Sequence, residues 1–119
     1  WNTMFKSWFD IEVPEDRLGC LQDIHWSMGA FGYFPTYTLG NLYAAQLLEA
    51  MAMDLGDVDD MVASGNWQPM LEWLRPRIHK RGSQVSPAKL IEDATGAPPS
   101  PEPFLRYVER KYGALYQLG

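Results

Sequence analysis

The stretch PTYTLGNLYAAQLLEAMAMDLG, residues 35–56, decides the fold class of this chain. It predicts a long helix that follows Pro35, because its larger side chains recur with the period of a helix and trace one face. The residues on that face are Leu39, Leu42, Tyr43, Gln46, Leu47 and Ala50. Gly56 suits the end of such a helix, since glycine readily adopts the left-handed conformation found there.

Helical patterns continue on both sides of this stretch. Helices are expected over residues 1–9, after Pro14, over 57–65, over 66–82, over 86–96 and from residue 100 onward. Two segments predict connections, a Gly- and aromatic-rich loop at 27–35 and a Pro-rich connector at 97–103. No segment alternates with the two-residue period of a strand. The sequence therefore predicts an all-α protein in which residues 1–119 form a single helical region.

Composition excludes several classes of protein. The net charge of −5 opposes binding to nucleic acid, which is a polyanion. Cys20 is the only cysteine, so an internal disulfide is excluded and a reducing compartment, the cytoplasm, is expected. No apolar run approaches the roughly 20 residues of a membrane helix. The chain begins with Trp1 rather than Met, which favours a piece of a longer protein, with a trimmed start as the alternative.

The segment Gly19-Cys20-Leu21-Gln22-Asp23-Ile24-His25-Trp26 concentrates groups that can carry chemistry. A carboxylate beside a histidine can fix its tautomer and raise its basicity. Asp23 and His25 would share a side in an extended segment but would not face each other within a helix. Taken alone, the residues favour a structural histidine bonded to a backbone carbonyl over a functional one.

Tyr33 and Tyr37 form a second candidate group within the segment 29–41. Their spacing places them on one helical face or on either side of a helix start. A phenolic hydroxyl can donate a hydrogen bond to a carbonyl oxygen whose charge grows in a transition state. The alternative is an aromatic core whose hydroxyls reach water or the backbone, and the residues alone favour that alternative.

A self-contained metal site is not expected. Catalytic zinc usually takes three protein ligands, often two histidines four residues apart on a helix. His25 and His79 are the only histidines and stand 54 positions apart. The acidic run at 57–60 is explained better by a helix start than by a cation site, and the basic run at 77–81 by a helix end.

Several motifs together resemble one known family. Gly19-x-x-Gln22-Asp23-x-His25-Trp26 matches a signature of the thermostable metallocarboxypeptidase family typified by carboxypeptidase Taq. The segments 31–37, 39–47, 71–74, 86–91 and 105–107 are also similar to that family and occur in its order. The resemblance covers essentially the whole chain. It implies the C-terminal part of a longer, mostly helical catalytic domain.

The resemblance also implies an activity. The family removes single residues from peptide C-termini with zinc or cobalt, bound upstream by a His-Glu-x-x-His motif and a further Glu. None of these ligands has a counterpart here, so the isolated chain is expected to bind no metal and to be inactive. The implied partners are a peptide substrate, the rest of the carboxypeptidase chain and a second copy in a homodimer.

Site roles follow from the resemblance residue by residue. His25 is expected to hydrogen-bond the substrate near the scissile peptide, and Tyr37 to reach the substrate carbonyl, with Tyr33 as a second candidate. Gln22 and Asp23 are expected to orient His25, and Trp26 to bind substrate or support these groups. Two other readings stay open. The chain could be a non-catalytic helical module that binds peptides or proteins, or a purely structural helical domain.

Overall fold

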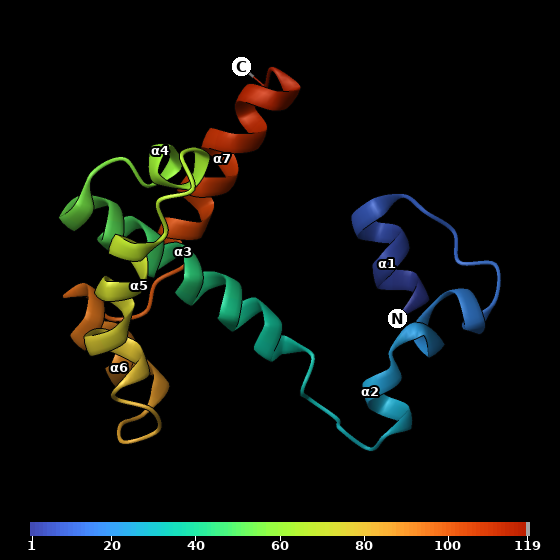
Figure 1. Cartoon of the computed structure of the whole chain (residues 1–119). Helices are drawn as coiled ribbons and strands as arrows, with labels where there is room; N and C mark the ends of the chain where they lie inside the picture. The colour runs from blue at the N-terminus through green and yellow to red at the C-terminus, as the bar shows by residue number, and fades with distance from the viewer. Residues whose placement is uncertain (119) are drawn as a thin grey trace. The chain divides into compact units, whose positions relative to one another are not determined.

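The computed structural model describes residues 1–118, and this part of the chain folds into helices and turns without a strand (Figure 1). The predicted all-α class is confirmed. The chain divides into two compact units, which we call unit 1 (Trp1–Thr36) and unit 2 (from Tyr37 onward). No helix within residues 1–118 is long and apolar enough to cross a membrane.

Unit 1 contains two short α-helices joined by two 3-10 turns. The helices are α1 (Asn2–Phe9) and α2 (Ile24–Ser27), and the turns are η1 (Asp16–Leu18) and η2 (Cys20–Gln22). The helix expected after Pro14 is therefore replaced by two single turns. Gly19 separates them with φ −129° and ψ −117°, a conformation that no helix accommodates.

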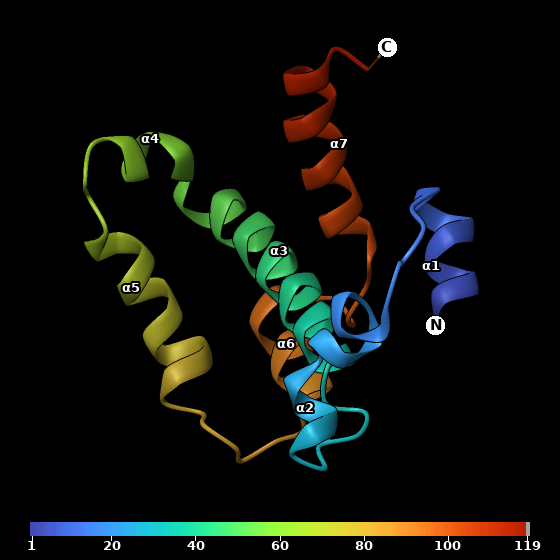
Figure 2. The same cartoon turned by 90° about the vertical axis from the view of Figure 1, so that its right-hand side faces the viewer.

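Unit 2 is built around α3 (Pro35–Leu55), whose first two residues still belong to unit 1. Figures 1 and 2 show the later helices gathered around α3. They are α4 (Val58–Ala63), α5 (Gln68–Leu74), the π-helical turn η3 (Arg75–His79), α6 (Pro87–Thr95) and α7 (Glu102–Tyr116). The core brings together Ala50 and Met51 of α3, Val58 of α4 and Trp73 of α5. The long helix predicted after Pro35 is confirmed.

Gln46 is a polar member of the buried face of α3, with an exposed fraction of 5%. Its amide nitrogen lies 3.1 Å from the Thr95 hydroxyl oxygen and from the Ala97 and Pro98 carbonyl oxygens. Its own carbonyl oxygen accepts the Ser100 N–H at 3.1 Å. The side chain thereby fixes the Pro-rich connector that leads from α6 to α7.

Local capping residues behave largely as the sequence predicts. The Asp57 carboxylate accepts the Asp60 N–H at 2.9 Å, so it caps α4. Ser86 caps α6, which ends at Gly96 with a left-handed φ of 80°. Pro76 falls within η3, where Lys80 N–H donates to the Arg75 carbonyl at 2.9 Å. The acidic run at 57–60 thus contains a helix cap.

Candidate functional site

Asp23 and His25 interact through two hydrogen bonds at the start of α2. Asp23 is the N-cap residue in an extended conformation, with φ −79° and ψ 100°. Its Oδ1 atom accepts the backbone N–H of His25 at 2.8 Å and lies 2.8 Å from His25 Nδ1. Because an ionised carboxylate only accepts, Nδ1 carries the proton in this contact. One carboxylate oxygen therefore fixes the start of the helix and the orientation of the ring.

The loop after α2 brings Tyr33 and Phe34 onto the His25 ring. The Tyr33 ring stacks on His25 with a centroid distance of 5.2 Å, and the Phe34 ring meets it edge-on at 5.7 Å. The His25 carbonyl accepts N–H groups from Met28 and Ala30, at 3.2 and 2.8 Å, which closes the loop. The His25 side chain retains 17% exposure and Asp23 22%. The ring is thus packed and oriented but still reachable.

Tyr33 and Tyr37 lie on either side of a helix start, because α3 begins at Pro35. This is the second of the two arrangements that their spacing allows. Their exposed fractions are 50% and 52%. Tyr33 belongs to unit 1 and Tyr37 to unit 2. Both tyrosines are therefore about half exposed.

Gln22, Asp23 and Trp26 line one hollow within unit 1. Its volume is about 490 Å³, and its other lining residues are Trp1, Gly19, Cys20, Gly32, Phe34 and Pro35. The Gln22 amide donates to the Arg17 carbonyl, which connects η2 to η1. The Trp26 ring contacts Phe31 at a centroid distance of 5.9 Å. The three residues with expected supporting roles thus share one concave surface.

The first glycine of the segment has a packing role that sequence reasoning missed. A Cβ atom on Gly19 would lie 2.6 Å from Val13 Cγ1 and 3.2 Å from the Trp1 ring. Both separations are shorter than ordinary van der Waals contact. Glycine at this position allows the start of α1 and the segment before η1 to approach the turn between η1 and η2 closely. The available clue in the sequence was the position of Gly19 shortly before the candidates Gln22 and Asp23.

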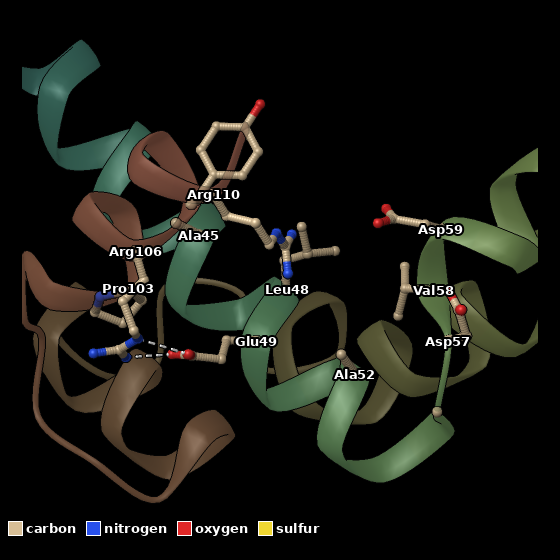
Figure 3. Close-up of a pocket in the computed structure, with 12 residues that line it drawn as sticks. Ala45, Leu48, Glu49, Ala52, Asp57, Val58, Asp59, Pro103, Arg106 and Arg110 are labelled. Atoms are coloured by element: carbon tan, nitrogen blue, oxygen red, sulfur yellow. Dashed lines mark hydrogen bonds and ion pairs between the residues drawn. The ribbon is translucent and has the colours of Figure 1, made fainter. Parts of the chain in front are cut away.

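A larger hollow of about 600 Å³ lies in unit 2 between α3 and α7 (Figure 3). Arg106 of α7 lines it and donates to both carboxylate oxygens of Glu49 of α3, at 3.0 and 2.7 Å. These hydrogen bonds hold the pKa of the Glu49 carboxyl below its usual value. The hollow contains none of the expected site residues. The ion pair connects α3 to α7.

The described residues do not assemble a metal centre. Among residues 1–118, no group of three or more His, Cys, Asp or Glu side chains is positioned to hold an ion. Three protein ligands, the usual number for a catalytic metal, are therefore not brought together within the described part of the chain.

The comparisons with known proteins agree on one family. A family model described as carboxypeptidase Taq (M32) metallopeptidase matches residues 1–112. Thermostable carboxypeptidase 1 of Thermus thermophilus is 47% identical over 116 residues, which are 98% of this chain and 23% of that protein. Carboxypeptidase 1 of Bacillus subtilis is 39% identical over 118 residues, 99% of this chain and 24% of that protein. The chain thus spans about a quarter of the length of these relatives.

Solved structures give the same result. A metallocarboxypeptidase 1 from Trypanosoma cruzi is 42% identical and superposes with a TM-score of 0.89 over 94% of this chain and 24% of its own. An M32 carboxypeptidase from Deinococcus radiodurans is 33% identical, with a TM-score of 0.92 over 99% of this chain and 24% of its own.

Proposed function

The chain belongs to the carboxypeptidase Taq (M32) metallopeptidase family, and on that premise we propose that it is the substrate-side wall of a metal-dependent carboxypeptidase. The complete enzyme would hydrolyse the C-terminal peptide bond of peptides. In this proposal residues 1–119 form one C-terminal region of a longer catalytic domain. The Asp23–His25 pair at 2.8 Å is the observation in this region that carries the proposal.

His25 is the proposed substrate-positioning group. With Nδ1–H bonded to Asp23, Nε2 is the ring nitrogen that we assign to the peptide near the scissile bond. Stacking against Tyr33 limits rotation of the ring. A preoriented group lowers the entropic cost of holding a substrate in a reactive geometry. His25 would therefore contribute through orientation that exists before the substrate binds.

Tyr37 is the proposed oxyanion-stabilising donor, with Tyr33 as a second candidate. A hydroxyl aimed at the position where negative charge develops stabilises the transition state more than the bound substrate. Gln22, Asp23 and Trp26 are the proposed supporting residues, because all three line the hollow in unit 1. We assign that hollow to part of the peptide rather than to the metal.

The metal belongs to the part of the enzyme outside this chain. We propose zinc or cobalt, held by ligands from that part, because residues 1–118 bring no three potential ligands together. When bound, such an ion activates water for hydrolysis. Location in the cytoplasm, supported by the single Cys20, and a homodimeric assembly are further parts of the proposal.

A chimaera tests this function directly. Its host is Thermus thermophilus thermostable carboxypeptidase 1, in which the matching 116-residue region is replaced by this chain. We expect release of C-terminal amino acids that a chelator abolishes, whereas the isolated 119-residue chain releases none. A folded, metal-loaded chimaera without activity would contradict the enzymatic role and favour a non-catalytic helical binding module. The Bacillus subtilis relative provides a second host for the same exchange.

A further inference from the structure

Unit 1 has no hydrophobic core of its own. Gly19 is the only buried residue between positions 1 and 36, whereas the buried apolar side chains all lie in unit 2. Exposed large apolar side chains in unit 1 are Trp1, Met4, Trp8, Phe9, Ile11, Leu18, Leu21, Ile24, Trp26, Met28, Phe31, Tyr33 and Phe34. Segments below about 40 residues seldom fold on their own apolar burial. Unit 1 therefore requires an external apolar surface to become stably ordered.

The side of α1 that carries Met4 and Trp8, which we call the Met4–Trp8 face, is the best-defined part of this exposed surface. The two side chains are four residues apart, so they share one side of the helix, and they are 54% and 68% exposed. Lys6 lies on the opposite side and forms an ion pair with Glu12. An uncharged pair at this spacing is typical of a helix that packs against another helix.

The lengths of the relatives indicate which part of the protein would cover this face. The matched region is 23% of the Thermus protein and 24% of the Bacillus protein, so about three quarters of each relative lies outside it. The same fold, with a TM-score of 0.92 to the Deinococcus structure, is there part of one much longer chain. Large apolar patches on soluble proteins mark interaction sites. A contact within one chain also forms independently of the protein concentration, unlike a contact with a separate partner.

We propose that the Met4–Trp8 face of α1 packs against an apolar helix from the part of the carboxypeptidase chain outside these 119 residues, and that this contact orders unit 1. The inference rests on the proposed function, because it takes its partner from the complete enzyme. It gives a role to α1 (Asn2–Phe9), which carries none of the proposed substrate-contacting groups.

The contact would also support the substrate-binding groups. A Cβ on Gly19 would lie 3.2 Å from the Trp1 ring and 3.5 Å from Asn2 Oδ1, so the start of α1 contacts the segment that leads to Asp23. Ordering α1 therefore restrains the turn that presents the Asp23–His25 pair. Trp8 is a positioning residue in this scheme and touches no substrate.

Hydrogen exchange of the α1 amides tests the inference. In the isolated 119-residue chain we expect the amides of residues 5–9 to exchange without protection at every protein concentration. In the chimaera we expect protection to rise by about tenfold or more, as burial of a large apolar side chain would provide. Trp8→Glu should remove that protection and raise KM or lower kcat, while the α3 amides stay protected. Thr3→Glu, which adds the same charge away from the face, should preserve the α1 protection and the kinetic parameters.

Three results would overturn the inference. Protection of α1 in the isolated chain would show that the chain covers the face itself, and protection that rises with concentration would assign the face to a second copy. Equal protection of the α1 amides and equal kinetic parameters in Trp8→Glu and Thr3→Glu would show that the face is not buried. Activity and amide protection, measured on the same chimaera, distinguish the two proposals. A protected α1 in an inactive chimaera would contradict only the proposed enzymatic function. An unprotected α1 in an active chimaera would contradict only the proposed packing of the Met4–Trp8 face.

Discussion

Asp23 Oδ1 lies 2.8 Å from the backbone nitrogen of His25 and 2.8 Å from its ring Nδ1. A single oxygen atom thus serves both as the cap of α2 and as the partner of the imidazole. Capping fixes the backbone at His25, and the ring contact then sets the side-chain orientation. Helix start and ring orientation are therefore coupled through one side chain.

Substitution of Asp23 can separate its role as the cap of α2 from its role as the partner of the His25 ring. Asn caps helices about as well as Asp, so Asp23→Asn should keep α2 intact while it weakens the charge-assisted contact to the ring. We expect kcat/KM of the chimaera to fall by about tenfold, the equivalent of one hydrogen bond to a charged group. Asp23→Ala should lose the cap as well and expose the His25 amide to hydrogen exchange. Equal kcat/KM for Asp23→Asn and the parent would remove Asp23 from the mechanism.

Replacement of Tyr37 by Phe tests the proposed oxyanion donor. The hydroxyl is assigned to charge that develops in the transition state, so its loss should lower kcat by roughly 100-fold and leave KM nearly unchanged. Tyr33→Phe removes the hydroxyl of the second candidate and keeps the ring that stacks on His25 at 5.2 Å, so the variant with the larger loss of kcat identifies the donor. Steady-state kinetics of the chimaera measures both. An unchanged kcat for Tyr37→Phe would exclude the role.

Gln46→Leu should destabilise unit 2 despite the similar size of the two side chains. It removes the partners of the Ser100 N–H and of the connector carbonyls, which then become unsatisfied near the core. We expect a loss of about 1–3 kcal/mol in the free energy of unfolding, measured by urea denaturation of the 119-residue chain. Gln84→Leu, at an exposed position, is the control and should change it little. An unchanged free energy of unfolding for Gln46→Leu would show that the connector is held by apolar contacts instead.

The Glu49–Arg106 pair should make stability depend on pH. Hydrogen bonds from Arg106 lower the pKa of folded Glu49 below its usual value of 4.5. The pair therefore stabilises the fold above that pH, and the contribution is lost as the pH falls through the lower, folded value. Both side chains are well exposed, so solvent screening keeps this contribution small.

Comparison of Arg106→Met with the parent chain measures this effect. The urea midpoint of the variant should be lower at pH 7, and the difference should shrink on acidification below the usual pKa of the carboxyl. Arg110→Met removes a charge from the same helix without breaking a direct hydrogen bond to Glu49, so its effect should be smaller. A constant difference between parent and Arg106→Met at all pH values would assign the loss to packing.

The sequence by itself determined the features that depend on near neighbours along the chain. The helix after Pro35, the Asp57 and Ser86 caps and the Gly96 terminus all follow from helical periodicity or from a bond spanning a few residues. The motif from Gly19 to Trp26, together with the similar segments that follow it in order, likewise indicated the family, which the family model confirms.

Only the tertiary structure decided the remaining relationships. Gln46 was predicted on the core-facing side of a helix, but its partners lie 49 to 54 residues away and depend on how α3 meets the connector. The His25 ring meets Asp23 and Tyr33 because the cap is extended and the following loop folds back. Such contacts depend on backbone geometry and on which side chains fill a shared space, and neither quantity is contained in local periodicity.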